Sequence, residues 1–485
     1  MLRPVRLVRI LCTFPKKFTG NVISKLQDIG IVHLIRTGEI NGFKPVKLDN
    51  DEYNKLPLLL KRTNSLIKLI ESRTLKPVMR KFFGPMYVSV SSKDYDDLGR
   101  LVKQLKQLET KYMELKYVRT KINISDYNQL LIFRDVINDK LDRLKALQLF
   151  SESKFLMLFQ GWVQHDKVER VKNVINIATE DKSAFEVHNP KPDEDPPTLL
   201  RNLRMVKPFE IFTEYYGTPG YKEIDPTFII AFSFTFIFGL MFADIGYGLS
   251  LVVLSIFAYF YTTKESMFRR NLNLVLVYFG LSSMFFGFLV GEFFGIHFRK
   301  GVLDPVNDIL LFLIISVLIG LVHMSIGILS KILTNIKDKK NLIHALSLLL
   351  VMWSAFSIYF QRDLVLNKIL LGIGILGLLI IKKFEILKEL SSVLVGAVSY
   401  MRIAILGLGH LIINRLLISS FSNLSGSLIE ISLFLILFFI GSLIVLTFGV
   451  FVAAIQVLRL HWLEFYSQFF IGKGKKFEAF KHSVF

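Results

Sequence analysis

Long apolar runs dominate the second half of the chain. They cover approximately residues 228–261, 271–296, 307–331, 342–360, 365–381, 384–418 and 428–470. A membrane-spanning α-helix needs about 17–25 predominantly apolar residues. The first run exceeds one crossing and is interrupted at 243–248, which predicts two helices meeting at a tight turn. The pattern therefore predicts an α-helical polytopic membrane protein with about eight transmembrane helices.

The last run is unusually long. A helix over most of residues 428–470 would extend about 60 Å, about twice the thickness of the hydrocarbon core. Such a helix must tilt steeply or project from the membrane. We expect the last two helices to be long and tilted, a geometry suited to lying against a curved partner.

The first half mixes strand-like and helix-like patterns. Alternating apolar positions predict strands near 5–11, 32–35, 86–90 and 155–159. Helical spacing predicts helices near 18–29, 53–73, 97–119, 133–144 and 166–177. Two arrangements fit this pattern: α/β lobes joined by an antiparallel helical hairpin into an elongated arm, or a compact α+β domain.

Composition supports a division into domains. The 485 residues are 52% hydrophobic and 21% charged, and the mean hydropathy is +0.45, which is too apolar for a soluble protein and too charged for a wholly embedded one. Residues 189–197 are rich in proline and charge, a composition typical of a linker. We expect an N-terminal arm over 1–195, a linker and membrane entry over 196–227, a transmembrane domain over 228–472 and a basic tail over 473–485.

The formal net charge of +20 follows the positive-inside rule. Basic loops near 264–270, 331–340, 382–388 and 473–481 fall on alternate sides of the predicted spans. This distribution places both termini and the arm in the cytoplasm. The sequence has no stripe of Lys and Arg interleaved with aromatic residues and no zinc spacing, which argues against a nucleic-acid partner.

Cys12 is the only cysteine, which excludes an intrachain disulfide framework and fits a reducing compartment. The N-terminus lacks the continuous apolar stretch of a cleavable signal. Both features fit the plasma membrane of a prokaryote, such as an archaeon. No phosphate-binding glycine loop occurs, so we expect no nucleotide, other cofactor or metal on this chain.

Arg402 lies deep inside the run that ends near residue 418. An arginine cannot lose its charge by deprotonation, and its cost at a transmembrane helix centre is about 3 kcal/mol. An anionic group must therefore approach it. Arg459 lies deep in the last run and shares a helix face with Gln456, but it could also extend toward lipid headgroups beside Trp462.

Four other ionisable residues lie in or near the spans. His410 could relay protons or simply pack, and Glu389 begins the segment of Arg402 as either a solvated carboxylate or a guide for cations. Asp244 and Glu292 are more simply explained by helix capping and loop solvation.

Several motifs, in order, resemble the membrane stator subunit of V-type and archaeal A-type rotary ATPases, called subunit a and subunit I respectively. The motifs are the entry over 216–227, the hairpin over 238–248, Gly291–Gly295, Ser399–Arg402 and Leu458–Phe465. The resemblance covers essentially the whole chain and is strongest after Pro196. The chain is short for that family, mainly in the arm helices.

The resemblance implies a non-catalytic subunit of an ATP-hydrolysing or ATP-synthesising complex. Arg402 would face the carboxylates of a proteolipid ring, between two aqueous half-channels that carry H⁺ or Na⁺. Arg459 and Gln456 would hold or hydrate this site, Glu389 would line a half-channel, and His410 would be a candidate relay. The implied partners are the ring, peripheral stalks docked on the arm, a subunit at the base of the central stalk, and the bilayer.

Two alternatives compete with this interpretation. A secondary ion or solute transporter, unrelated to ATP, would also carry charges inside the membrane, but its halves should repeat with broken helices at matching positions. A membrane scaffold would explain the arm and the spans but not Arg402.

Overall fold

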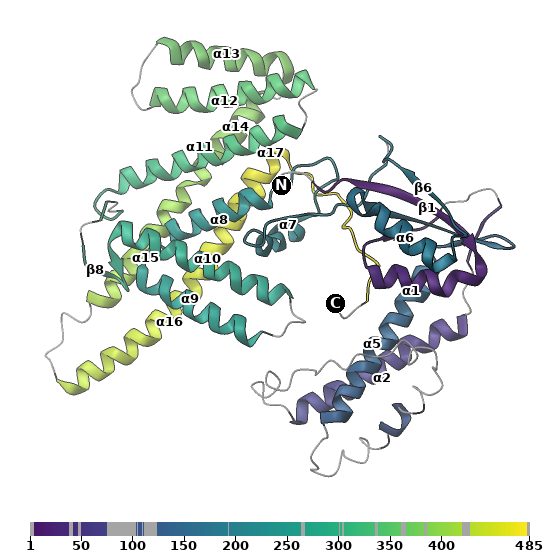
Figure 1. Ribbon diagram of the computed structural model, residues 1–485. Coiled ribbons are helices and arrows are strands. Elements are labelled where there is room, and N and C mark those ends of the chain that lie inside the picture. Colours follow the sequence, from purple (N-terminus) through teal and green to yellow (C-terminus); the bar gives the residue numbers. More distant parts are fainter. Residues whose placement is uncertain are drawn as a thin grey trace. The chain divides into compact units, whose positions relative to one another are not determined.

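The computed structural model describes residues 4–37, 42–46, 50–74, 103, 105–108, 110, 124–192, 194–262, 267–299, 301–302, 305–334, 338–359, 365–382, 386–419 and 427–482. The chain forms two compact units (Figure 1). The membrane unit contains Leu200–Lys475 with Met1–Pro4, and the N-terminal unit contains Val5–Leu199 with Lys476–Phe485.

The N-terminal unit is built on a mainly antiparallel sheet. Its central strands are β1 (Leu7–Pro15) and β5 (Leu156–Gln164), which pair from Leu7 opposite Gln164 to Pro15 opposite Leu156. The sheet order is β3-β4-β5-β1-β6, and β2 also pairs with β5. The remaining strands are β2 (His33–Ile35), β3 (Lys44–Pro45), β4 (Ser151–Glu152) and β6 (Ala184–His188).

Helices α1 (Thr19–Ile29) and α6 (Val168–Thr179) contact each other and pack on this sheet. Their buried positions, such as Val22, Leu26, Val171 and Ile175, recur at three- and four-residue steps and cover apolar side chains of β1 and β5. The amphipathic pattern of both helices thus explains the core.

A helical pair extends the same unit. Helix α2 (Asn50–Thr74) packs against α5 (Ile124–Leu147) (Figure 1). A small apolar cluster in this region includes Leu66, Leu108 and Leu130. Residues 105–108 are helical, in the expected 97–119 segment. The predicted strand near 86–90 and most of that segment lie outside the described residues.

The predicted tail is divided between the two units. The backbone of Lys473 forms an isolated β-bridge with Thr218 in the membrane unit. The backbone of Lys476 forms one with Thr198 in the N-terminal unit. Phe477 is buried and Phe480 packs against the core of the N-terminal unit. Two aromatic side chains in a basic segment thus allow the segment to dock instead of remaining in solvent.

The membrane unit is helical. Its elements are α7 (Glu210–Tyr216), α8 (Thr227–Met241), α9 (Ile245–Tyr261), α10 (Met267–Val290), a small hairpin of β7 (Glu292–Phe293) and β8 (Ile296–His297), α11 (Ile309–Thr334), α12 (Lys339–Tyr359), α13 (Val365–Lys382), α14 (Ile386–Ser399), α15 (Met401–Ser419), α16 (Leu428–Arg459), a π-helix over Leu460–Tyr466 and α17 (Ser467–Phe469).

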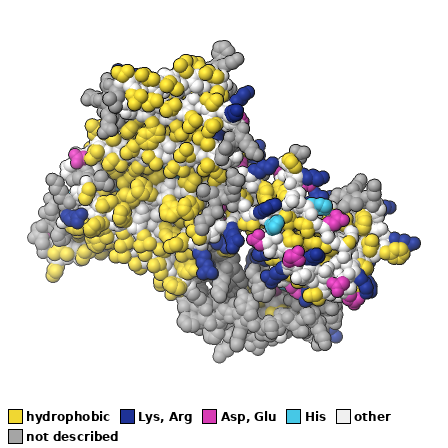
Figure 2. Space-filling model, turned by 45° about the horizontal axis from the view of Figure 1, so that its top comes forward, with side chains coloured by type: hydrophobic (Ala, Val, Ile, Leu, Met, Phe, Trp, Pro, Cys, Tyr) yellow, Lys and Arg dark blue, Asp and Glu magenta, His cyan; other side chains and the backbone are white. Residues whose placement is uncertain are grey.

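Within the described residues, five helical stretches are long and apolar enough to cross a membrane: Met267–Val290, Ile309–Thr334, Lys339–Tyr359, Ile386–Ser419 and Leu428–Phe469. Three shorter apolar helices, Thr227–Met241, Ile245–Tyr261 and Val365–Ile381, accompany them. Figure 2 shows hydrophobic side chains across much of the visible surface of this unit. The chain has the architecture of a polytopic membrane protein, and the count of eight spans stays a prediction.

The last helical stretch is the least covered by the rest of the chain. Leu428–Phe469 is continuous over 42 residues, and only 6% of its most apolar window is buried among the described residues. Large side chains such as Phe439, Phe448 and Phe451 are exposed along it. An apolar surface of this length needs lipid or another protein around it.

The first hairpin is held by Asp244. Its side chain accepts hydrogen bonds from the backbone N–H groups of Tyr247, Phe294 and Gly295, each at 3.0 Å. Asp244 is therefore the N-cap of α9 and also fastens the β7–β8 hairpin. The capping role expected for this carboxylate is thus present in the structure.

Candidate functional site

A break in the helix lies directly before Arg402. Helix α14 ends at Ser399 and α15 begins at Met401, with Tyr400 between them. Hydrogen bonds from Tyr400 N to Ala397 O and from Ile403 N to Tyr400 O tighten the chain at this point. The apolar run by itself predicts one continuous helix, and the break gives Arg402 the first turn of a new helix.

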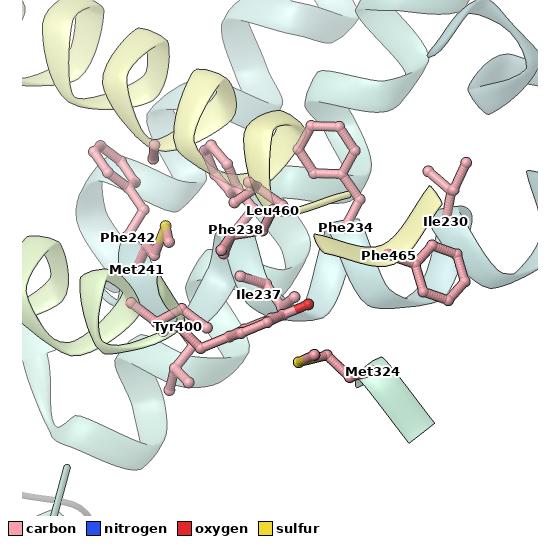
Figure 3. Close-up of a cluster of buried hydrophobic side chains, with 14 of the residues drawn as sticks. Ile230, Phe234, Ile237, Phe238, Met241, Phe242, Met324, Tyr400, Leu460 and Phe465 are labelled. Atoms are coloured by element: carbon pink, nitrogen blue, oxygen red, sulfur yellow. The ribbon is translucent and has the colours of Figure 1, made fainter. Parts of the chain in front are cut away.

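Tyr400 occupies the core of the membrane unit (Figure 3). Its ring is fully buried and its hydroxyl group lies 2.7 Å from Nδ1 of His323 on α11. A Cβ at Gly320 would overlap the ring, so this glycine makes room for Tyr400 against α11. Because a buried tyrosine and its hydrogen-bond partner resist movement, the position of the break is well determined.

Arg402 is not fully neutralised within the described part of the chain. Its Nη2 donates a long hydrogen bond of 3.4 Å to Ser399, and its Nη1 lies 3.9 Å from Oε1 of Glu464. The latter distance is an ion-pair contact but too long for a hydrogen bond. Nη1 is buried and finds no hydrogen-bond partner among the described residues, while 29% of the side chain is exposed.

Arg459 lies near Arg402. It ends α16, and the two guanidinium groups are close enough for their charges to interact. Gln456, one turn earlier, has a buried Oε1 for which the described residues offer no donor. Two cations thus lie close together, and Gln456 lies one helical turn before the second of them.

Glu464 is the residue of this site that sequence reasoning missed. It lies within hydrogen-bond reach of Ser399 and in electrostatic contact with both arginines. It belongs to the π-helix over Leu460–Tyr466, in which backbone bonds link residues five apart, so Glu464 comes onto the face of Arg459. The only signal in the sequence was an acidic residue next to a predicted arginine site.

Glu389 lies elsewhere. It stands in the first turn of α14, 26% exposed, with Oε1 3.6 Å from Nε2 of His344 on α12. It precedes Arg402 by thirteen positions, or about 20 Å of helix. The structure therefore does not bring Glu389 and Arg402 together.

His410 is enclosed by aromatic rings. It stacks on Phe242 with 4.0 Å between ring centroids, and its Nε2 lies 3.0 Å from Nδ2 of Asn414. Tyr247 contacts the same ring edge-on. This environment matches the packing role, one of the two that the sequence leaves open.

Glu292 departs from its expected role. The sequence predicts a solvated loop carboxylate, but Glu292 is completely buried and accepts two hydrogen bonds from Arg415, at 2.8 and 2.5 Å. His297 lies 3.3 Å from the same carboxylate oxygen. Arg415 lies inside α15. One acidic and one basic residue in neighbouring apolar segments were the signal that could have predicted the pair.

The described residues contain no cluster of three His, Cys, Asp or Glu side chains that could hold a metal ion. The chemistry available at the Arg402 site is electrostatic. Two guanidinium groups, one acidic side chain and one amide can attract and orient an anionic group that comes from another molecule.

Comparisons with known proteins point to one family. The model of the V-type ATPase 116 kDa subunit family matches residues 84–300. The A-type ATP synthase subunit I of Methanocaldococcus jannaschii is 24% identical over 96% of this chain and 74% of its own length. The corresponding subunit of Pyrococcus horikoshii is 30% identical over 78% of this chain and 62% of its own.

The subunit I of Methanothermobacter thermautotrophicus is 26% identical over 78% of this chain, which spans 59% of that relative. The chain thus covers about three fifths of the length of several relatives. With its apolar helices it is an integral membrane protein. The family match and these relatives together lead to one conclusion: the chain is similar to the V-type ATPase 116 kDa subunit family and to subunit I of A-type ATP synthases.

Proposed function

We propose that this chain is the membrane stator subunit of a rotary A/V-type ATPase or ATP synthase. In this role it forms two aqueous half-channels against a ring of proteolipid subunits and couples the movement of H⁺ or Na⁺ to rotation of the ring. Each ring subunit carries a carboxylate that is neutral in lipid, because desolvation disfavours its charged form.

The incomplete neutralisation of Arg402 is the observation that supports this proposal. A guanidinium with one buried nitrogen lacking a hydrogen bond among the described residues, and with a contact of 3.9 Å to Glu464, retains capacity for another anion. A ring carboxylate that passes Arg402 would ionise there and release its ion to one half-channel. The fixed cation also repels an ion that would cross directly.

Glu464 and Arg459 lie close to Arg402 and would adjust how strongly it binds the ring carboxylate. Glu464 shares its charge between two arginines, which keeps either from holding the ring carboxylate permanently. Gln456 offers a buried oxygen that could accept from Arg459 or from water. We assign Glu389 to the mouth of a half-channel, since its partly exposed carboxylate begins the helix that leads to Arg402.

The uncovered surface of the last helical stretch supports docking of a ring. Its exposed side chains are apolar over most of its length and would contact the ring or lipid. We further propose that both termini and the N-terminal unit face the cytoplasm, and that this unit binds the peripheral stalks while the base of the central stalk meets the complex from the same side.

The first test is purification of the tagged chain from its native membrane, with mass spectrometry of the proteins that accompany it. The proposal expects a small apolar ring subunit and nucleotide-binding subunits. Recovery of the chain alone or as a homodimer would contradict the proposal.

The purified complex then allows a direct test of Arg402. Arg402→Ala should leave assembly intact and abolish ATP-driven ion transport in reconstituted vesicles. Lys388→Ala is a matched control, because Lys388 is an exposed cation in the preceding helix. Transport by the Arg402→Ala complex at the wild-type rate would remove Arg402 from the mechanism.

A further inference from the structure

Residues 476–482 run along the N-terminal unit as a docked strap. Phe477 N donates to Thr198 O at 3.0 Å, and Phe480 N donates to Val32 O at 2.8 Å. Lys481 lies against Gly30, the left-handed residue that ends α1. Backbone hydrogen bonds to two separate segments fix the register of the strap.

Two histidines hold this strap, one favoured in its charged form and the other in its neutral form. His482 bridges two helices: its Nδ1 lies 2.7 Å from Oδ2 of Asp139 on α5, and its Nε2 lies 3.1 Å from Oδ1 of Asp28 on α1. Both ring nitrogens face carboxylates, so only a protonated ring can donate to both. Lys25 pairs with Asp28 at 3.5 Å and competes for one of them.

His33 lies at the other end of the strap, where Phe477 packs on its ring at 5.5 Å. Its Nδ1 lies 3.0 Å from Glu478 N and 2.9 Å from Glu478 O. The neutral ring accepts from the N–H group, and the protonated ring would instead donate to the carbonyl. His33 is partly buried, and burial favours its neutral form, so the two histidines favour the docked strap in different protonation states.

We propose that residues 476–482 form a protonation-controlled clasp, which closes on the N-terminal unit when His482 is charged and His33 is neutral and opens when either condition is lost. The clasp follows directly on the membrane unit along the chain, after the segment that contains Arg459 and Glu464. Its opening would free residues 476–482 from the rest of the N-terminal unit.

The direction of the pH dependence follows from the two pKa values. Burial disfavours the charge on His482, but the hydrogen bonds from its ring to Asp139 and Asp28 outweigh burial and raise its pKa above the ordinary value. Its contribution is complete below about pH 6.5 and is lost as the pH rises through the raised pKa. Burial lowers the pKa of His33, despite the contact with Glu478. That contribution is present above about pH 6.5 and is lost as the pH falls.

Hydrogen exchange of the full chain in detergent tests the clasp between pH 5 and pH 9. Protection factors of residues 477–480, corrected for the intrinsic exchange rate, should be greatest near pH 6.5 and fall on both sides. The loss on the alkaline side should approach about tenfold for each unit by which the pKa of His482 is raised. Hydrogen exchange measures docking itself, so its result is independent of ion transport.

Variants test the alkaline fall and the acid fall of the protection factors separately. His482→Gln should lower protection at pH 6.5 and abolish the alkaline fall, whereas His482→Lys, which stays charged, should keep protection up to pH 9. His33→Gln should abolish the acid fall. His188→Gln is the matched control, because His188 is an exposed histidine of the same unit that contacts Glu186.

Protection of β1 and β5 in the same experiment shows whether each variant remains folded. If His482→Gln misfolds, Asp139→Asn replaces it and should lower protection at pH 6.5 in the same way. A flat wild-type profile, or an alkaline fall that persists in folded His482→Gln, would overturn the proposal.

Discussion

The side chains of Arg402 and Glu464 come close to each other because the regular α-helix is interrupted beside each of them. The break at Tyr400 places Arg402 in the first turn of a new helix, and the π-helix turns Glu464 onto the face of Arg459. Neither side chain is satisfied by the other, since 3.9 Å separates Nη1 from Oε1. At the scale of single residues, the site is a set of charges held apart and ready for an additional anion.

Replacing Glu464 by Gln tests this balance. The substitution keeps the shape but removes the acidic charge shared by the arginines, so Arg402 should hold a ring carboxylate too tightly. A hydrogen bond to a charged group is worth about 1.5–3 kcal/mol, which corresponds to a transport rate lower by about tenfold or more. ATP-driven transport in vesicles measures the effect. Unchanged transport would mean that Glu464 has no part in the cycle.

The Glu292–Arg415 pair makes a second prediction for single residues. Because Glu292 is completely buried, Arg415→Gln should leave its charge unpaired and destabilise the membrane unit by about 3–5 kcal/mol. The double variant Glu292→Gln with Arg415→Gln should lose much less. Thermal unfolding in detergent measures both, with the exposed Lys388→Gln as a control. Additive losses in the double variant would argue against coupling.

At the scale of elements, close contacts between helices determine where the interruptions fall. Gly320 of α11 accommodates the ring of Tyr400, and Gly248 of α9 lies so close to α10 that a Cβ on it would come within 2.8 Å of the carbonyl oxygen of Gly280. Small residues at such crossings let membrane helices approach closely. The break at Tyr400 is therefore a property of the helix packing and not of its own segment alone.

Gly320→Ala should displace Tyr400 and so move the start of α15. Overpacking of a buried contact costs about 1–3 kcal/mol, and transport should fall together with stability. Gly372→Ala is the matched control, because nothing lies within 4 Å of the added methyl group among the described residues and alanine favours the helix. Thermal unfolding and vesicle transport should separate the two variants. Equal behaviour would show that Tyr400 does not determine the geometry.

At the scale of the whole molecule, each of the two units has a main hydrophobic core of its own. One contains Phe238, Tyr400 and Leu460 of the membrane unit, and the other contains Cys12, Phe159 and Val171 of the N-terminal unit, with Phe480 packed against it. Stability of the N-terminal core thus depends on a residue that is distant in sequence and follows the last membrane helix.

Cys12 reports on the N-terminal core alone. It is the only cysteine, and burial raises the pKa of its thiol to about 12, so a thiol reagent at pH 8 should react only after local or global opening. Phe480→Ala should remove about 1–2 kcal/mol of packing and speed labelling by about tenfold. Gly320→Ala, in the other core, should leave the labelling rate unchanged. Equal acceleration by both variants would contradict separate cores.

Much of the fold follows from patterns that are local in the sequence. Apolar runs longer than a bilayer crossing predict membrane helices, and the structure has apolar helices in those runs. Alternation near residue 7 and helical spacing near residue 22 correspond to β1 and α1. Arg402 could be singled out because a permanent charge in an apolar run needs an explanation wherever the helix lies.

Other features depend on residues that no local pattern relates. Glu464 joins the arginines through a π-helix, Arg415 finds Glu292 from another segment, and His482 finds Asp28 and Asp139 hundreds of positions away. The sequence leaves two roles open for Glu389 and for His410, and only the folded chain shows that their side chains contact other helices. Local composition was enough to identify the segments that enter the membrane and the charge that must be accommodated there, because burial in lipid depends on the apolar content of each segment. The partners of each charge could be known only from the folded chain, because they depend on which helices pack together.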